Sequence, residues 1–323
     1  MLAIGLQGSP LKKGSTAYLL TRFMDELEAQ GARVQIIDVS RKNIQPCRGC
    51  GFCEKKGFCV IDDDDMSGEI YGLLRKAEIV VMASPVFFYS VTAQIKALID
   101  RSQTLWSRKY RFRLSDPLKK TRKGCFLSMG GSSGRQLFTG VNLVAKFFFD
   151  AIDANFAGSL TYRNIETPAD MRKVPHLSAD IQGLVTQNLM PAEPRKKVLF
   201  ACRENACRSQ MAGAFASHMG GDRLDVMTAG STPAQAVNPL MVQAMAEQGF
   251  DMAFRMPRPL DQAIERLQPD VIVTMGCGEE CPFVPGVVRM DWDLPDPANE
   301  PLAVMKKVRD EIKKKVSGFI DDL

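Results

Sequence analysis

The fold of the second half of the chain is decided by the stretch Val198-Leu199-Phe200-Ala201-Cys202-Arg203-Glu204-Asn205-Ala206-Cys207-Arg208-Ser209. An apolar run of strand length comes first, a Cys-x5-Arg-Ser loop follows it, and a helical pattern begins where the loop ends. Backbone N–H groups of such a loop converge on an anion, and the N-terminus of the helix adds partial positive charge. The stretch therefore predicts an α/β fold with an oxyanion-binding loop at the end of a strand.

The side chains of this loop are suited to nucleophilic chemistry on an oxyanion. Arg208 can offer a bidentate fork to two oxygens, and the positive field of the loop stabilises a thiolate on Cys202. Ser209 can donate a hydrogen bond to that thiolate, whereas Asn205 is expected to hold the shape of the loop. We therefore interpret Cys202 as the nucleophile. The alternative, a buried cysteine that happens to precede an arginine, fits this strand, loop and helix context poorly.

Alternating strands and helices continue on both sides of this stretch, which is typical of parallel sheets covered by helices on both faces. The sequence therefore predicts an α/β protein with two doubly wound parallel-sheet domains. We expect strands over 2–8, 33–39, 79–84, 125–129, 157–162, 198–201, 225–229 and 270–275, and helices over 15–30, 66–76, 91–105, 137–150, 168–188, 208–219, 238–249 and 301–322.

The domain boundary is expected near two prolines. A chain of 323 residues suits two domains of about 100–200 residues each. Pro191 and Pro194 stand among charged residues between two runs of regular structure, which is typical of a linker. We therefore place a first domain at residues 1–188, a linker at 189–195 and a second domain at 196–323.

The composition indicates a soluble globular protein, with 45% apolar and 24% charged residues. No apolar run approaches the ~20 residues that cross a bilayer, and no export signal precedes the first strand, so we expect no membrane association and a cytoplasmic location. A net charge of +5 does not indicate a nucleic-acid partner. The basic run at 108–123 is either a solvated loop or an anion site for a nicotinamide dinucleotide or an acidic protein.

Further motifs of the second half accompany the Cys202 loop, namely Thr228-Ala229-Gly230-Ser231, Val237-Asn238-Pro239, Thr274-Met275-Gly276-Cys277 and Trp292-Asp293-Leu294-Pro295-Asp296-Pro297. With these motifs, residues 196–323 resemble the low-molecular-weight protein tyrosine phosphatase superfamily, which includes the arsenate reductases. The resemblance implies a phosphatase-like fold in which Asp296 protonates the leaving oxygen, because oxide is a poor leaving group.

Within this superfamily, the second half resembles the arsenate reductases. Small and polar residues follow Asp296-Pro297, where the family's phosphatases usually carry aromatic residues, and extra thiols are present. The resemblance implies that Cys202 attacks arsenate and that Cys207 then attacks Cys202 and expels arsenite. Cys277 or Cys281 would relay the disulfide to a thioredoxin-like reductant. Alternatively, the Cys277/Cys281 pair is a structural or metal-touching motif.

Three loops of the first half each follow a predicted strand, so they are expected to meet at one edge of the sheet. Hydroxyls and backbone N–H groups of the first loop suit a phosphate, and aromatic residues of the second suit a flat isoalloxazine ring. Ordinary packing is the alternative for Phe87, Phe88 and Tyr89. The expected contacts are Ser9, Lys12, Gly14, Ser15, Thr16, Ser84, Pro85, Val86, Phe87, Phe88, Met129, Gly130 and Gly131.

Together these loops make residues 1 to about 188 resemble the flavodoxin-like NADPH-dependent FMN reductases. The resemblance implies FMN as cofactor and NAD(P)H as electron donor. FMN sites in this family commonly lie at a subunit interface, so it also implies a homodimer or tetramer.

Cysteines form a second pattern in the first half, Cys47-x2-Cys50-x2-Cys53-x5-Cys59. Within the flavin family this pattern resembles the iron–sulfur flavoproteins. Three cysteines at this spacing wrap one face of a compact cluster, which implies a [4Fe–4S] cluster. Free or redox-active thiols and a zinc site stay open as alternatives. Cys125 lies in a predicted strand and is expected in the core.

The two resemblances together predict an enzyme of arsenic detoxification. It is an arsenate reductase that uses Cys202 and a thiol relay, fused to an FMN-dependent NAD(P)H oxidoreductase. Two other functions stay open. One is a low-molecular-weight protein tyrosine phosphatase fused to a flavin reductase, and the other is a non-catalytic oxyanion sensor.

Overall fold

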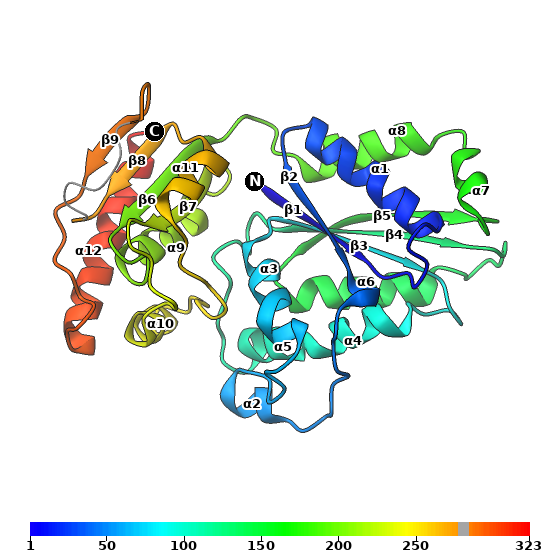
Figure 1. Cartoon of the computed structure of the whole chain (residues 1–323), viewed down its shortest axis with the longest axis horizontal. Helices are drawn as coiled ribbons and strands as arrows, with labels where there is room; N and C mark the ends of the chain where they lie inside the picture. The colour runs from blue at the N-terminus through cyan, green and yellow to red at the C-terminus, as the bar shows by residue number, and fades with distance from the viewer. Residues whose placement is uncertain (277–283) are drawn as a thin grey trace. The chain divides into compact units, whose positions relative to one another are not determined.

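The computed structural model describes residues 1–276 and 284–323, and they divide into two compact units (Figure 1). The first unit comprises Met1–Arg113 and Thr121–Met190, and the second comprises Leu114–Lys120 and Pro191–Leu323. Each unit is built on a parallel sheet covered by helices. The predicted fold class, two doubly wound α/β domains, is confirmed.

The first sheet has the strand order β2-β1-β3-β4-β5, with every pairing parallel. Because the chain passes from β2 across β1 to β3, the strand order reverses beside β1, and ligands of open α/β sheets bind outside the strand ends at such a point. The strands are β1 (Leu2–Gln7), β2 (Arg33–Asp38), β3 (Ile79–Pro85), β4 (Lys123–Gly130) and β5 (Asn155–Arg163).

Helices cover both faces of this sheet, with α1, α7 and α8 on one side and α3 to α6 on the other (Figure 1). Alternate strand residues such as Ala3, Val81 and Leu127 pack against Leu19 and Phe23 of α1 in one buried cluster. The helices are α1 (Ser15–Ala29), α2 (Phe52–Lys56), α3 (Tyr71–Lys76), α4 (Ala93–Arg101), α5 (Gln103–Tyr110), α6 (Thr139–Ala151), α7 (Pro168–Arg172) and α8 (Leu177–Leu184), with a 3₁₀ turn at Val39–Arg41 and π-helical turns at Met66–Ile70 and Val185–Leu189.

Two of the long helices expected from the sequence are divided. The helix expected over 91–105 ends at Arg101, and α5 begins at Gln103. Ser102 lies between them, and its hydroxyl donates to the Leu98 carbonyl (3.0 Å), a side-chain bond that bends helices. The helix expected over 168–188 is interrupted at Pro175, which cannot continue a helix that has already begun.

The second sheet has the strand order β7-β6-β8-β9, again with parallel pairings. Phe200 of β6 lies at the centre of one core, with its ring 5.7 Å from that of Trp292, and α11 covers the opposite face through Leu260 and Ala263. Neither β9 nor α11 was expected from the sequence. The elements are β6 (Lys196–Cys202), α9 (Arg208–Gly220), β7 (Leu224–Gly230), α10 (Pro239–Ala246), α11 (Leu260–Leu267), β8 (Val271–Thr274), β9 (Val288–Asp291) and α12 (Leu302–Asp321).

Residues 114–120 belong to the second unit although they precede the expected linker by about 70 positions in the sequence. The Ser115 N–H donates to the Gly249 carbonyl and the Asp251 N–H donates to the Ser115 carbonyl, both at 2.8 Å. This segment lies inside the basic run 108–123. Elsewhere in the run, Arg122 is fully buried and donates to three backbone carbonyls at 2.8–3.0 Å. Part of the run is therefore structural, and it is not simply a solvated loop.

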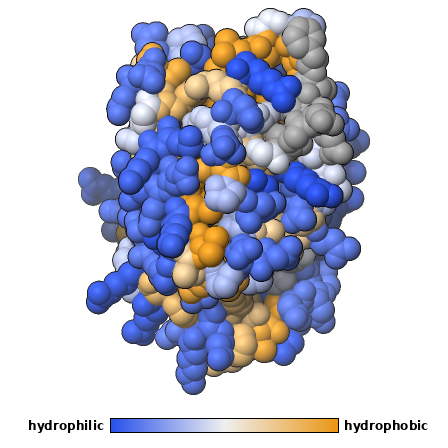
Figure 2. All heavy atoms as spheres, turned by 90° about the vertical axis from the view of Figure 1, so that its left-hand side faces the viewer, coloured by the Kyte–Doolittle hydropathy of each residue, from blue (hydrophilic) through white to orange (hydrophobic). Residues whose placement is uncertain are grey.

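One face of the molecule is mostly polar. Figure 2 shows one face of the molecule, which is largely hydrophilic with isolated hydrophobic groups between charged side chains. Within residues 1–276 and 284–323, no helix combines the length and apolar character that a bilayer-crossing segment requires.

Two helical glycines of the second unit test the packing directly. A Cβ on Gly213 of α9 would lie 2.3 Å from Thr228 Cγ2, whereas a Cβ on Gly318 of α12 meets nothing within 4 Å. We expect Gly213→Ala to lower the free energy of unfolding by about 1–3 kcal/mol through overpacking, and Gly318→Ala to raise it by about 0.4–1 kcal/mol. Urea denaturation of both variants measures this, and equal effects of the same sign would contradict the packing of α9 on β7.

Candidate functional site

Backbone hydrogen bonds determine the orientation of the anion loop between β6 and α9. Residues 231–238 lie along the outside of the loop, and their N–H groups donate to its carbonyls. Because the C=O and N–H of a trans peptide point in opposite directions, each such bond turns the next N–H of the loop away from this segment. These N–H groups of the loop are thereby left without partners in residues 231–238 and can donate to an oxyanion. The bonds run from Ser231 to Cys202 (3.3 Å), Thr232 to Arg203 (2.8 Å), Ala234 to Glu204 (2.9 Å) and Asn238 to Ala206 (3.1 Å).

Side chains inside the loop direct a hydrogen bond at Cys202. Asn205 has φ 52°, and its Oδ1 accepts from the Arg258 N–H (3.0 Å) and from Gln210 Nε2 (3.2 Å). The amide NH2 of Asn205 must therefore face Ser209, to whose Oγ it donates at 2.8 Å. Ser209 Oγ accepts this bond and lies 3.0 Å from Cys202 Sγ, so its own hydrogen is available to donate to a thiolate there.

Two thiols are buried in this site, Cys202 and Cys207. Burial raises the pKa of Cys207 to about 12, and the charge of the neighbouring Cys202 adds to the shift. Cys207 is therefore protonated at neutral pH and is not available as a nucleophile in this conformation.

Arg208 and Asp296 form an ion pair, with 2.6 Å between Nη2 and Oδ2. The Arg208 side chain is 5% exposed and that of Asp296 is 50% exposed. Arg208 Nη1 also donates to the Leu294 carbonyl (3.2 Å), and Asp296 Oδ1 accepts from the Ala298 N–H (3.1 Å). An oxyanion that takes the Arg208 fork must therefore displace the Asp296 carboxylate. The two other cysteines expected here, Cys277 and Cys281, lie outside the described residues.

The three loops expected to bind a flavin do meet at one edge of the first sheet. The Gly8 N–H donates to the Ala83 carbonyl (2.8 Å) and the Val86 N–H to the Met129 carbonyl (3.0 Å). Thr16 Oγ1 lies 3.1 Å from Met129 Sδ. The strand order thus brings the candidate residues of all three loops to one edge of the sheet. Lys12, on the first loop, is exposed.

The start of α1 fits a phosphate group. Its N-cap is Gly14, so no side chain bonds to the free N–H groups of the first turn. The buried hydroxyl of Ser15 has no hydrogen-bond partner within the protein. Buried polar atoms are normally paired, and an acceptor such as a phosphate oxygen would supply the partner that Ser15 lacks.

An exposed turn of aromatic residues follows β3, at the same edge of the sheet as this candidate phosphate site. Phe87 and Ser90 exchange two backbone hydrogen bonds of 2.9 Å, and the residues between them, Phe88 and Tyr89, have φ of 49° and 60°. Such angles cost bulky residues about 1–3 kcal/mol each and are concentrated at functional sites. Phe87 is half exposed and Phe88 fully exposed. Packing of Phe87 into the core, the alternative left open by the sequence, is wrong.

Four of the five cysteines of the first unit line one cavity. This cavity has a volume of about 370 Å³ and its walls include Cys47, Cys50, Cys53 and Cys59 together with Arg48, Arg101 and Thr104. The Ser107 hydroxyl lies 3.7 Å from Cys53 Sγ. In the described part of the chain, no three Cys, His, Asp or Glu side chains are arranged to hold a single metal ion. The thiols thus share a space without converging on one point.

Several residues of these sites escaped the sequence-based prediction. Gln210 directly follows Arg208-Ser209, so its position was a usable signal. Arg101 occupies the buried face of α4 with Ile95 and Leu98, and an arginine on an otherwise apolar helical stripe is also a signal. The backbone donors of residues 231–238 could not be predicted, because residue type does not indicate which backbone N–H groups donate to the loop.

The Arg208–Asp296 pair makes a prediction about anion binding. Asp296→Asn removes the carboxylate that competes for Arg208. Because an ion pair with a half-exposed partner is worth about 0.2–1 kcal/mol, we expect the dissociation constant for inorganic phosphate to fall by up to about 5-fold, as measured by titration calorimetry. Asp293→Asn is the control, since it removes the same charge from an exposed position of the same loop. An equal gain in both variants would contradict the competition.

Comparison with known proteins identifies relatives for each half. Residues 1–138 match the family NADPH-dependent FMN reductase, and residues 197–323 match the family low molecular weight phosphotyrosine protein phosphatase. An arsenate reductase of Staphylococcus epidermidis is 36% identical over 128 residues, which are 39% of this chain and 96% of the relative.

Relatives of the first half include iron-sulfur flavoproteins. One from Archaeoglobus fulgidus is 43% identical over 101 residues, which are 31% of this chain and 45% of the relative. Another from Methanocaldococcus jannaschii is 32% identical over 149 residues, which are 46% of this chain and 72% of the relative. The match with the first of these thus spans less than half of that protein's length. The chain is a fusion that belongs to the NADPH-dependent FMN reductase family in its first half, beside the iron-sulfur flavoproteins, and to the low molecular weight phosphotyrosine protein phosphatase family in its second, beside the arsenate reductases.

Proposed function

We propose that this chain is an arsenate reductase fused to an FMN-dependent NAD(P)H oxidoreductase. The observation that carries the proposal is the Cys202 loop between β6 and α9, where Ser209 Oγ lies 3.0 Å from the Cys202 sulfur and Arg208 begins the helix that follows. Arsenate is a tetrahedral oxyanion of the size and charge of phosphate, so the same donors suit both. The relatives of this half favour arsenate, because arsenate reductases match it over almost their whole length.

The first step is an attack of the Cys202 thiolate on arsenic. A sulfur–arsenic bond forms, one arsenic–oxygen bond breaks, and the departing oxygen leaves as water after it has taken a proton from Asp296. Arg208 binds two oxygens of the arsenate through its fork. Ser209 holds the thiolate in place before the attack through the hydrogen bond described above.

The second step reduces the arsenic. Cys207 attacks Cys202 Sγ and a disulfide forms. The electron pair of the sulfur–arsenic bond leaves with arsenic as arsenite, which takes up the proton of Cys207. Because burial keeps Cys207 protonated, the surroundings of Cys207 must change after the first step. Cys277 or Cys281 then takes over the disulfide, and a thioredoxin-like protein or the flavin half supplies the two electrons that restore the thiols.

The first unit is proposed to bind FMN at the three-loop edge of its sheet. FMN, when bound, supplies hydride acceptance from NAD(P)H and release of electrons one at a time. Ser15 and the open first turn of α1 would hold its phosphate. The aromatic turn at 87–90 and the loop after β4 would contact the ring. We extend this to a homodimer or tetramer, since Phe87, Phe88 and Tyr89 are exposed beside the site.

The four-cysteine cavity is proposed to hold an iron–sulfur cluster, [4Fe–4S]. A cluster supplies one-electron transfer when bound. A zinc ion needs its sulfurs about 2.3 Å from one centre, whereas a cluster binds each thiolate at a different iron. Four thiols that line one cavity of about 370 Å³ leave room for the larger group.

Loss of one sulfur atom tests the reaction of the second half. In Cys202→Ser, we expect arsenate-dependent oxidation of thiols to fall at least about 10⁴-fold, because a serine hydroxyl is not ionised at neutral pH and cannot form the disulfide. Arsenite release is measured with purified full-length chain, and bound flavin is measured by its absorbance, which should be unchanged.

The same assay separates the alternatives. Full arsenate turnover by Cys202→Ser would refute the proposed mechanism. Cleavage of an aryl phosphate without any reductant, at a rate above that of arsenate reduction, would identify a phosphatase instead. Phosphate binding with neither activity would identify an oxyanion sensor.

Chemical analysis tests the cluster. The chain purified without oxygen should contain about four iron and four sulfide per chain together with FMN, and Cys50→Ser should lose most of the iron but keep the flavin. Cys125→Ser is the control, because that thiol is fully buried in β4, away from the cavity. Zinc in place of iron, or iron unaffected by Cys50→Ser, would contradict this assignment.

A further inference from the structure

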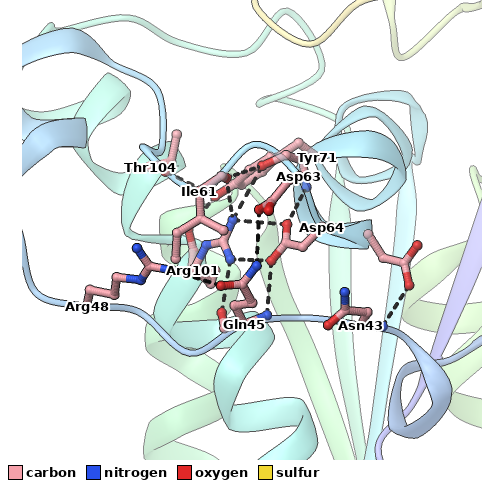
Figure 3. Close-up of polar contacts among 11 residues, drawn as sticks. Asn43, Gln45, Arg48, Ile61, Asp63, Asp64, Tyr71, Arg101 and Thr104 are labelled. Atoms are coloured by element: carbon pink, nitrogen blue, oxygen red, sulfur yellow. Dashed lines mark hydrogen bonds and ion pairs between the residues drawn. The ribbon is translucent and has the colours of Figure 1, made fainter.

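A buried ion pair lies at the base of the cysteine loop, residues 46–60. Arg101 at the end of α4 and Asp64 both have fully buried side chains, and they make two contacts of 2.5 Å and 3.2 Å between the guanidinium and the carboxylate. Figure 3 shows this pair at the centre of the polar network, with Gln45 on one side and Ile61 on the other.

The pair joins the two chain segments that enter and leave the loop. Arg101 Nη1 donates to the Gln45 carbonyl and Nη2 to the Ile61 carbonyl, each at 2.9 Å. Asp64 accepts from the Gln45 N–H (3.0 Å) and the Ser67 N–H (3.2 Å). The entering and leaving segments are therefore held by the same two side chains.

Further bonds between these segments act beside the pair. The Asn43 N–H donates to Asp65 Oδ2 (2.7 Å), the Asp65 N–H donates to the Asn43 carbonyl (3.0 Å), and Gln45 Nε2 donates to Asp63 Oδ1 (3.1 Å). Above this base, the regular structure within the loop is the five-residue helix α2. The conformation of the loop thus depends on the hydrogen bonds at its base and on its contacts with the rest of the first unit.

Arg101 also belongs to the wall of the cavity that the thiols line. Its backbone carbonyl is fixed by the Tyr71 hydroxyl at 2.7 Å, and that hydroxyl lies 3.0 Å from Thr104 Oγ1. Thr104 lines the same cavity. One rigid group of buried side chains therefore forms the base of the loop and part of the cavity wall at once.

We propose that Arg101 and Asp64 are positioning residues that hold the cysteine loop in the conformation in which its four thiols share one cavity. Two thiols, Cys47 and Cys50, follow closely on Gln45, and Cys59 precedes Ile61 by two positions. A shift at either end of the loop therefore moves a thiol. The proposal concerns the protein chain alone and does not depend on which group the thiols bind.

A bridging reagent measures whether the thiols stay together. Dibromobimane becomes fluorescent when two nearby thiolates have each displaced one of its bromides. We expect chelator-treated, reduced full-length chain to form bridges within residues 47–59, located by peptide mapping. In Arg101→Met the yield of these bridges should fall about tenfold or more, because Asp64 is left buried without its partner.

Arg101→Lys keeps the charge but not the planar fork that reaches Asp64 and two carbonyls together. Its bridging yield should therefore lie between that of the unaltered chain and that of Arg101→Met. If Arg101→Met does not fold, the bridging yield of Arg101→Lys still tests whether Arg101 positions the thiols. Arg122→Met is the matched control, because Arg122 is equally buried in the same unit and donates to carbonyls at Ala77, Arg75 and Ile152, outside the loop. Its folded form should bridge like the unaltered chain.

Bridging at the unaltered level in Arg101→Lys, or an equal loss in Arg122→Met, would overturn the proposal. The first result would show that the fork does not position the thiols, and the second that the loss reflects general destabilisation. Absence of iron from the unaltered chain would leave the bridging result intact, so a failure of the cluster assignment is distinguishable from a failure of this inference.

Discussion

Parallel strands that end at a common edge constrain where this chain can place its chemistry. In the first sheet β1, β3 and β4 are neighbours, and in the second β6 lies between β7 and β8. Because parallel strands run the same way, the loops after them gather at one edge although they are far apart in the sequence. The candidate flavin residues after Gln7, Pro85 and Gly130 meet for this reason. Cys202 stands at the corresponding end of β6.

The cysteine loop is an exception, because it is held by a buried ion pair. Burial alone would raise the pKa of Asp64, but hydrogen bonds from Arg101, Gln45 and Ser67 outweigh it and lower the pKa. The carboxylate thus stays ionised at neutral pH and keeps its partner. Such a pair adds little stability over apolar residues of the same volume, yet losing one member costs about 3–5 kcal/mol. The pair therefore serves to favour one conformation of the cysteine loop, since few other arrangements satisfy two buried charges and two backbone carbonyls.

The two sites differ in how far the sequence predicts them. Cys202, Asn205, Arg208 and Ser209 are contiguous, so local pattern was enough to place them together. Arg101 and Asp64 are 37 positions apart, and Asp64 reads as one of several acidic residues in a row. The sequence pattern also predicted one continuous helix across Ser102. The structure divides it there, because the Ser102 side chain competes for a backbone carbonyl. Contacts made by long-range packing or by backbone donors, such as Thr232 to Arg203, cannot be inferred from residue type.

The resting second site keeps its reactive groups apart. Arg208 bonds to Asp296 and to the Leu294 carbonyl, and burial keeps Cys207 protonated. Two neighbouring thiolates would repel each other and would be open to oxidation before substrate arrived. In the proposed reaction, arsenate displaces the Asp296 carboxylate from Arg208. The freed carboxylate then takes up a proton, from solvent or from the bound arsenate, and passes it to the leaving oxygen. Substrate binding and release of the proton donor are then a single exchange of partners at Arg208, so the acid becomes available only when there is an oxygen to protonate.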